Sequence, residues 1–202
     1  GVYATGGRPS ARSTLMNRVC LERPVTLRSL NWPSFVTLKG RWNSAEEPAG
    51  PDAVRGVCLD HPKARLEGVR VENGATELFG DQYGGGIFCG YAESVVSNCL
   101  VRGCVAASDG GGLYGGMAFN STLSDNRADA GGGAAGATLK RCALSGNTAV
   151  WYGGGAFGGS LVNCLVNNNG AGTAGGVAEA LLYNCTVVAN SASERCGGMN
   201  AC

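Results

Sequence analysis

A cluster of charged residues near the middle of the chain is the first place where the sequence could support chemistry. Carboxylate oxygens are the ligands that Ca²⁺ prefers, and basic residues beside them would complete a site for an acidic polysaccharide. Solvated turns explain the same charges equally well. This candidate ligand or calcium face consists of Asp109, Asp125, Asp129, Arg127, Lys140 and Arg141.

Nucleophilic catalysis has little support in the sequence. A serine or cysteine hydrolase needs a base beside its nucleophile. The single histidine, His61, is followed directly by Pro62, a pair typical of a loop. We therefore predict no catalytic residue, no bound metal and no cofactor.

Ten cysteines would ordinarily indicate a disulfide framework in a secreted chain. Several of them, however, recur at one position of a repeat, where stacked residues lie about 4.8 Å apart with parallel side chains. That geometry is awkward for a disulfide, and a straight line of sulfurs cannot surround a tetrahedral metal ion. We expect Cys142, Cys164 and Cys185 to be buried free thiols. The better disulfide candidates are Cys89, Cys104, Cys196 and Cys202, and the pairing of these four and of Cys20 and Cys58 stays open.

The cysteines belong to a repeat of about 22 residues that begins at each glycine cluster. Copies begin at residues 84, 110, 131, 153 and 175, and a further copy begins at 197. The first copy carries about four extra residues after its glycines, which predicts a bulging loop. A fixed period of this kind is typical of stacked coils.

Three residue types recur in register when the copies are superposed. Two of these columns lie two positions apart, so both should point inward from a short strand. In the third, an asparagine amide can donate to the next coil and accept from the previous one. The thiol column is Cys99, Ser121, Cys142, Cys164 and Cys185; the aliphatic column is Val101, Leu123, Leu144, Val166 and Val187; the amide column is Cys104, Asn126, Asn147, Asn169 and Asn190.

These patterns predict an all-β fold, a right-handed parallel β-helix with coils of about 22 residues. We expect one domain over residues 1–202, because no linker separates the halves. Residues 84–202 should form regular glycine-rich coils. Residues 1–83 should form wider, less regular coils, with the longest loop over 43–52.

Composition and charge exclude several classes of function. Charged residues are 15% of the chain and the formal net charge is +1, so no basic stripe would attract nucleic acid. No apolar run is long enough to cross a membrane as a helix, so we expect no membrane insertion by this segment.

Three aromatic residues, Phe88, Tyr114 and Phe157, recur in one column of the repeat. Their rings could stack on sugars or pack against the body of the protein.

The glycine clusters and asparagine motifs resemble a known family. GGGLY pairs with LSDN, GGGAA with LSGN, GGGAF with LVNN, and GGVAE with VVAN. This pairing is similar to the repeats of glycine-rich right-handed parallel β-helix proteins, including the polymorphic outer-membrane-protein-like repeats of bacterial surface and secreted proteins.

The resemblance implies a fold and a location more than an activity. It implies a bacterial, extracellular or cell-surface scaffold that is not an enzyme, serves adhesion or carbohydrate contact, and is a fragment of a longer protein. Its partners would be surface glycans or other copies of itself. Two alternatives stay open: a polysaccharide lyase or hydrolase of the same architecture, and a structural protein that forms filaments by stacking end to end.

Overall fold

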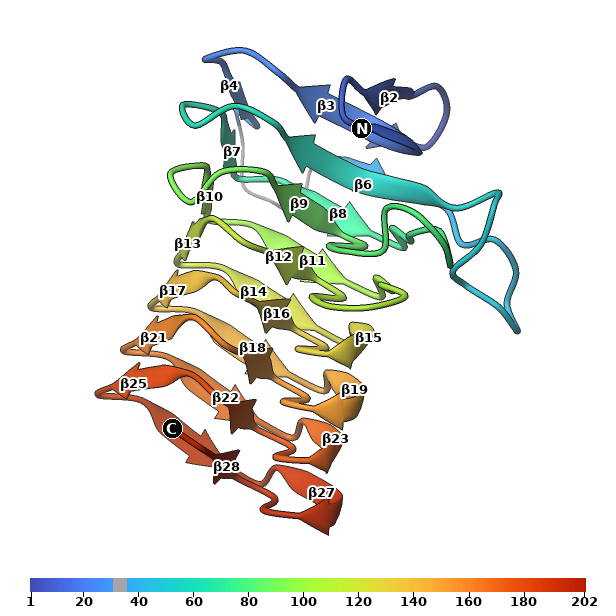
Figure 1. Cartoon of the computed structure of the whole chain (residues 1–202). Helices are drawn as coiled ribbons and strands as arrows, with labels where there is room; N and C mark the ends of the chain where they lie inside the picture. Colours follow the sequence, from blue (N-terminus) through green and yellow to red (C-terminus); the bar gives the residue numbers. More distant parts are fainter. Residues whose placement is uncertain (31–35) are drawn as a thin grey trace.

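The fold is all-β. A computed structural model describes residues 1–30 and 36–202, and over these residues it contains no helix. Its strands form four sheets of nine, eight, seven and four strands. The strands within these sheets pair in parallel, except that β2 (Arg8–Ser10) pairs antiparallel with β3 (Ser13–Leu21). Figure 1 shows the strands stacked in chain order from the N-terminus to the C-terminus.

Each sheet takes strands from successive repeats. After β2 and β3, the nine-stranded sheet contains β6 (Val54–Leu59), β9 (Ile87–Cys89), β12 (Leu113–Tyr114), β16 (Ala134–Ala135), β20 (Ala156–Phe157), β24 (Val177–Ala178) and β28 (Met199–Asn200). The seven-stranded sheet contains β4 (Thr26–Arg28), β7 (Arg65–Glu67), β10 (Val95–Ser97), β13 (Met117–Phe119), β17 (Thr138–Lys140), β21 (Ser160–Val162) and β25 (Leu181–Tyr183). The eight-stranded sheet contains β1 (Val2–Tyr3), β5 (Thr37–Lys39), β8 (Arg70–Glu72), β11 (Leu100–Arg102), β14 (Thr122–Ser124), β18 (Ala143–Ser145), β22 (Leu165–Asn167) and β26 (Thr186–Val188). The four-stranded sheet contains β15 (Arg127–Ala130), β19 (Thr148–Tyr152), β23 (Gly170–Thr173) and β27 (Ser191–Arg195).

The chain visits these sheets in a fixed order. The repeat that begins at 131 places β16 in the nine-stranded sheet, then β17 in the seven-, β18 in the eight- and β19 in the four-stranded sheet, before β20 returns to the first. Each return brings the chain beside its own previous strand, in register. This topology of parallel sheets is compatible with a β-helix.

Single residues in the left-handed conformation turn the chain from one sheet to the next. In the repeat 131–152 they lie five positions apart, at Gly131, Gly136, Arg141 and Gly146, with φ of 61°, 60°, 54° and 66°. Glycine and asparagine reach this conformation at the least cost. The turn between the seven- and eight-stranded sheets therefore forms a second file rich in asparagine. It begins at the buried Gly68 and continues through the exposed residues Asn98, Asn120, Arg141, Asn163 and Asn184.

The core is a narrow stack of small and aliphatic side chains. Within each five-residue segment, the first and third residues after the turn point inward, as Ala137 with Leu139 and Cys142 with Leu144, all at most 3% exposed. Both the thiol and aliphatic columns are therefore internal, as the alternation predicted. Ser121 takes the place of a thiol and is also buried, where its hydroxyl accepts from Cys99 N–H at 3.1 Å and donates to Phe119 O at 2.8 Å.

Buried asparagines join the repeats along the turn between the eight- and four-stranded sheets. The Nδ2 of Asn147 donates to Leu123 O at 2.9 Å and to Asn169 Oδ1 at 3.0 Å. Its Oδ1 accepts from the backbone N–H and the Nδ2 of Asn126, each at 3.0 Å. One amide thus satisfies its two donors and its acceptor with bonds that link three repeats.

The asparagine ladder has different ends. At the C-terminal end, Asn190 Oδ1 accepts from Asn169 N and Nδ2, while its own Nδ2 donates to Val166 O and to Val188 O of its own strand. At the N-terminal end, Cys104 N–H donates to Asn126 Oδ1 at 3.0 Å. Cys104 keeps the backbone contact of the column but contributes no amide.

Glycine triplets pack directly against this ladder. A Cβ added to Gly133 would lie 2.5 Å from Gly155 O and 3.0 Å from Asn147 Nδ2. The equivalent glycines of the neighbouring repeats, Gly112, Gly155 and Gly176, show the same two contacts within 3.1 Å. The triplet is therefore required by the close approach of consecutive backbones, which leaves no space for a side chain.

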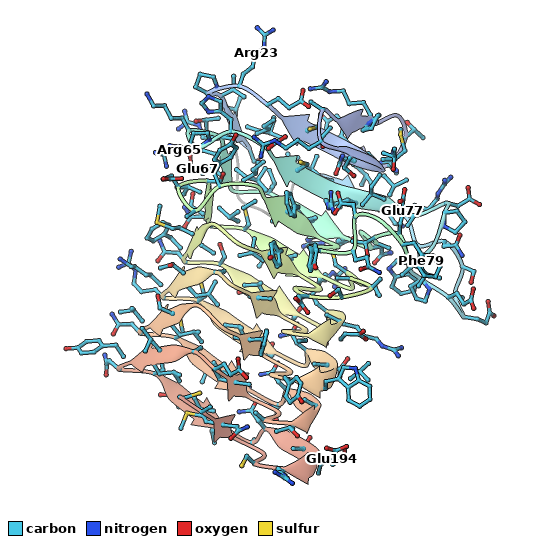
Figure 2. The ribbon with its side chains drawn as sticks, viewed as in Figure 1. Arg23, Arg65, Glu67, Glu77, Phe79 and Glu194 are labelled. Atoms are coloured by element: carbon cyan, nitrogen blue, oxygen red, sulfur yellow. The ribbon has the colours of Figure 1, made fainter. Side chains whose placement is uncertain are left out.

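The N-terminal repeats carry the insertions. The loop 43–52 projects beside the segment 74–84, and Figure 2 shows Glu77 and Phe79 on these projecting loops. Phe79 is 85% exposed. The extra residues after β9 occupy 90–94, between that strand and β10, where the sequence predicted a bulge. At the N-terminal edge of the nine-stranded sheet, β2 and β3 form an antiparallel hairpin.

The disulfide prediction is not supported. All ten cysteines are free. Cys89 and Cys104 lie inside the core, where burial raises the pKa of each thiol to about 12, so both act as small apolar residues. Cys196 and Cys202 are exposed at the C-terminal end.

The asparagine ladder predicts a large cost for truncating one amide. Asn147→Ala leaves the buried backbone N–H of Asn126 without an acceptor and breaks the link to Asn169. Because an unsatisfied buried polar group costs about 1–3 kcal/mol, we expect a loss of about 2–3 kcal/mol in urea unfolding. Asn167→Ala, in the partly exposed part of β22, is the matched control and should change stability by under about 0.5 kcal/mol. Equal losses would contradict the role of the ladder.

The glycine triplet predicts that an alanine destabilises the fold more where neighbouring backbone leaves no space for its methyl group than where only a left-handed φ opposes it. Gly133→Ala pushes a methyl group into Gly155 O, which is backbone and cannot move away, so we expect a loss above about 3 kcal/mol or a failure to fold. Gly136→Ala meets nothing within 4 Å and has only the left-handed φ to oppose it. That variant should lose about 1–2 kcal/mol. Thermal unfolding of the pair provides the comparison, and the reverse order would contradict the packing argument.

Candidate functional site

Irregular segments of the N-terminal repeats converge on the outer face of the nine-stranded sheet. They are the turn of the β2–β3 hairpin, the connection after β6, the loop that ends before β9 and the connection after β9. Between them lies a groove of about 450 Å³, within the range of about 300–1,000 Å³ typical of small-molecule sites. The groove is lined by Ser10, Arg12, Ser13, Thr14, Asp60, Gly80, Asp81, Tyr83, Phe88 and Gly90.

An aromatic platform forms the inner wall of this groove and extends beyond it. Phe88 and Tyr114 are register partners on adjacent strands, and their rings stack at 5.7 Å with 1° between the planes. Tyr83, from the preceding loop, packs on Tyr114 with ring centroids 4.8 Å apart. We call Tyr83, Phe88 and Tyr114 the aromatic platform. Ala135 follows Tyr114 in the column and Phe157 follows Ala135, beside Tyr152 at 6.2 Å.

A fully buried arginine supports the platform. The guanidinium of Arg55 lies over the ring of Phe88, with its Cζ 5.0 Å from the centroid. Its Nε donates to Gly84 O at 2.9 Å and its Nη2 to Tyr83 O at 2.7 Å. Its Nη1 donates to Asn17 Oδ1 at 3.1 Å. All of these partners belong to β3 or to the loop before β9, so Arg55 fixes that loop to the sheet.

The remaining donors of Arg55 form a bidentate pair with Asp81. Nη1 donates to Oδ2 at 2.9 Å, and Nη2 donates to Oδ1. With these bonds, all five N–H donors of the guanidinium have acceptors. Burial raises the pKa of Asp81, but the hydrogen bonds and charge of Arg55 outweigh it, so the pKa of Asp81 lies below its usual value. Asp81 is therefore a stable carboxylate.

Arg12 reaches across the groove from the hairpin turn. Its Nη1 lies 3.4 Å from Asp60 Oδ1, its Nη2 donates to the hydroxyl of Tyr91, and its Cζ lies 4.9 Å from the Tyr91 ring centroid. The Asp60 side chain is only 5% exposed, whereas that of Arg12 is 60% exposed. Asp60 Oδ1 is buried and accepts no hydrogen bond. The ion pair is thus a partial partner for a carboxylate that still has acceptor capacity.

Two thiols lie on the same outer face. Cys20 and Cys58 are register partners on β3 and β6, in the column that continues to Phe88. The hydrogen bond between the two side chains lowers the pKa of Cys20 and raises the pKa of Cys58. This is a thiol pair outside the internal column.

The internal thiols offer no reactive site. Cys142, Cys164 and Cys185 lie in file, and Cys164 N–H donates to Cys185 Sγ at 3.5 Å. A hydrogen bond between Cys142 and Cys164 lowers the pKa of Cys164 and raises that of Cys142. Burial raises the pKa of Cys99 to about 11. Cys99, Cys142 and Cys164 are buried in the core, whereas Cys185, in the last repeat, is only half-buried.

The structure does not bring the six residues of the predicted calcium face together. Lys140 ends β17 and Arg141 follows at the next turn, while Asp125 lies at the turn after β14. Asp109 and Asp129 are near each other beside the four-stranded sheet: burial, and then the charge of Asp129, raise the pKa of Asp109 against a hydrogen bond from Ser108.

The other described residues do not supply the missing ligands of the predicted calcium face. Arg127 lines a separate cleft with Asp129. Within residues 1–30 and 36–202, no three His, Cys, Asp or Glu side chains are placed to hold a metal ion. The calcium interpretation therefore has no support in the geometry. His61 is a turn residue, as predicted, whose Nδ1 accepts from Lys63 N–H at 3.0 Å.

Sequence reasoning missed the groove. Arg12, Asp60 and Tyr91 are far apart in the chain, and the hairpin that joins them interrupts the repeat. One signal was present: in the alignment of β6 with β9, Arg55 stands beside Gly85, so a long cation occupies a position that is glycine in the later repeats.

Over the described residues there is no helix of the length and apolarity needed to span a membrane.

Comparison adds no relative. No family model, no curated protein and no solved structure matches the chain.

The Arg55 contacts predict a large loss of stability when only one partner of the buried Arg55–Asp81 pair is removed. Arg55→Met leaves Asp81 as an uncompensated, largely buried carboxylate, so we expect a loss of about 3–5 kcal/mol and fast amide exchange in residues 77–84. Arg55→Met with Asp81→Asn should recover part of that loss. Arg8→Met breaks the exposed Arg8–Glu22 bridge and serves as control, at under about 1 kcal/mol.

The same pair sets a pH dependence. Because the folded-state pKa of Asp81 is lowered from 3.8, its contribution is complete above that value and is lost as the pH falls through the folded-state pKa. Asp81→Asn should therefore flatten the acid limb of the melting-temperature profile. An unchanged acid limb of the profile, or an Arg55→Met variant as stable as the Arg8→Met control, would contradict the stabilising role of the Arg55–Asp81 pair.

Proposed function

We propose that the chain is one right-handed parallel β-helix, a non-enzymatic scaffold that contacts carbohydrate through the outer face of its nine-stranded sheet. The fixed order in which each repeat visits the four sheets supports the β-helix. The resemblance of the repeats to bacterial surface proteins supports an extracellular or cell-surface location, and the same resemblance favours adhesion.

The observation that carries the carbohydrate proposal is the aromatic platform beside a polar groove. Sugar rings present apolar C–H faces and hydroxyl edges, so their sites combine aromatic surfaces with a few polar groups. Here Phe88 and Tyr83 line a groove whose other walls carry Asp60, Arg12 and three hydroxyl residues. The hairpin turn, the connections after β6 and β9 and the end of the loop before β9 line this groove, and all of them depart from the regular repeat. Departures from a regular pattern are expected where a fold carries function.

The protonation of the groove supports binding over hydrolysis. A glycoside hydrolase needs a carboxyl with a raised pKa as its acid. Asp81 is held as a carboxylate by Arg55, with a lowered pKa. Asp81 therefore does not have the environment of a general acid.

A polysaccharide lyase or hydrolase is the second candidate, because Asp109 has the opposite environment. Burial and Asp129 raise its pKa, and its charge in turn contributes to the raised pKa of Tyr114 in the platform. A carboxyl with a raised pKa is a candidate for the general acid of such chemistry. The release of reducing ends or unsaturated products from a bound polysaccharide would favour this candidate.

Filament formation is the third candidate. Leu182, Cys185 and Val187 pack against the core but stay partly exposed, and β25 to β28 are edge strands. Head-to-tail stacking would set them against an edge where β2 runs antiparallel, which does not continue the parallel pattern. Light scattering over a concentration series distinguishes filaments from a monomeric scaffold.

Retention on polysaccharides tests the proposed function. We expect affinity electrophoresis in a panel of neutral and acidic polysaccharides to retard the chain. Tyr114→Ala should weaken retention about 2- to 10-fold, since an aromatic contact contributes about 0.5–1.5 kcal/mol. Tyr183→Ala, an exposed tyrosine of the seven-stranded sheet, should have no effect. Failure of every polysaccharide, or equal effects of both variants, would overturn the proposal.

A further inference from the structure

We propose that the groove between the β2–β3 hairpin and the nine-stranded sheet binds one uncharged sugar residue, with Asp60 accepting hydrogen bonds from its hydroxyl groups. The inference rests on the proposed carbohydrate contact and names the ligand class of that site. It depends on four features: the unused acceptor of Asp60, the movable cover of Arg12, the charge balance, and the shape of the wall beside Asp60.

Asp60 has an acceptor that the protein does not use. Only 5% of its side chain is exposed, yet Oδ1 accepts no hydrogen bond. A buried carboxylate oxygen without a donor is costly, so such atoms are exceptions that call for a partner. Among the described residues, the charged partner of this oxygen is Arg12 Nη1 at 3.4 Å, longer than the 2.7–2.9 Å of a charge-assisted hydrogen bond. A sugar hydroxyl is a donor of the required kind.

Arg12 is a cover that can move. It lies at the tip of a two-stranded hairpin, its side chain is 60% exposed, and its other contacts are the hydroxyl and ring of Tyr91 at the groove margin. Rotation of this side chain exposes Asp60 while the guanidinium stays within reach of the ligand. Arg12 then supplies donors to a sugar oxygen and Asp60 supplies acceptors, which is the pairing that vicinal hydroxyl groups require.

The charges of the groove favour a neutral ring. Asp81 is balanced by Arg55 in a bidentate pair, and Asp60 is balanced by Arg12. Among the described residues that line the groove, the one cation, Arg12, is already paired with a carboxylate, and an added carboxylate would lie beside Asp60 and be repelled. The hydroxyl groups of Ser10, Ser13 and Thr14 on the hairpin side are neutral donors and acceptors.

The wall beside Asp60 is shaped by a glycine. A Cβ on Gly90 would lie 2.8 Å from Asp60 Oδ1 and 3.5 Å from the ring of Phe88. The absence of a side chain there keeps the space between carboxylate and aromatic ring open. A sugar in that space would have Phe88 beside its C–H groups and Asp60 beside its hydroxyl groups.

Saturation-transfer-difference NMR with defined probes tests the inference on the whole chain. The probes are methyl β-D-glucopyranoside, methyl β-D-galactopyranoside, methyl α-D-mannopyranoside and methyl α-D-galactopyranosiduronate. We expect at least one neutral glycoside to bind at millimolar concentration and the uronate to bind at least fivefold more weakly. Asp60→Asn should weaken binding tenfold or more. Asp52→Asn, an exposed aspartate of the projecting loop, should leave binding unchanged.

A second variant acts without removing a charge. Gly90→Ala fills the space beside Asp60 Oδ1 and should weaken binding by a similar factor, with the melting temperature recorded for both variants. If both variants fold and still bind the neutral glycoside as the parent does, the inference is wrong. Preferential binding of the uronate also overturns it.

Phe157→Ala separates this inference from the broader proposal. Phe157 lies in the same column as Phe88 but outside the groove. If polysaccharide retention depends on Phe157 and not on Asp60, the sheet contacts glycans and the groove does not. If no probe and no polysaccharide binds, both proposals fail. Sensitivity of the neutral glycoside to Asp60 and Gly90, but not to Phe157, is the result expected.

Discussion

Contact between consecutive backbones at the glycine triplets is the constraint on which the rest of the structure depends. A glycine such as Gly133 lies so near the next repeat that no Cβ fits, and the amide of Asn147 fills the remaining polar space. The amide satisfies the backbone of the previous repeat and is satisfied by the next one. The stack therefore needs no large apolar core, and alanines, cysteines and single leucines suffice inside each repeat.

The same constraint explains why this groove lies where the pattern is broken. In the later repeats the glycine positions are closed by neighbouring backbone, so nothing can be added there. In β6 the equivalent position holds Arg55, whose side chain turns outward beneath the loop that ends at Gly84. The loop needs the arginine to fix it, and the arginine needs the loop to satisfy its donors. The insertion and the substitution depend on each other.

Sequence reasoning found the regular half because each residue type there reports a contact with its own copy. The thiol, aliphatic and amide columns gave the all-β class, the repeat length and the direction of Cys142 and Leu144. It did not find the turn at Arg141, because arginine, unlike glycine or asparagine, gives no sequence signal for the left-handed conformation that it adopts there. The disulfide expectation failed for Cys89 and Cys104 because both face the core: Cys104 takes the inward place of the amide column, and Cys89 lies in the longer first repeat, where no thiol column indicated its direction.

The groove could not be predicted from the sequence for a different reason. A repeat predicts contacts between positions about 22 residues apart, whereas Arg12 contacts Asp60 and Tyr91, which follow β6 and β9, 48 and 79 residues further along. Only an antiparallel hairpin, laid across the edge of a parallel sheet, can bring its tip over those later strands. Charge spacing therefore pointed to Asp109–Arg141, where the regular turns separate the charges onto different sides. The irregular half, which the repeat could not register, is the part in which an unsatisfied acceptor, an aromatic platform and a movable cation meet.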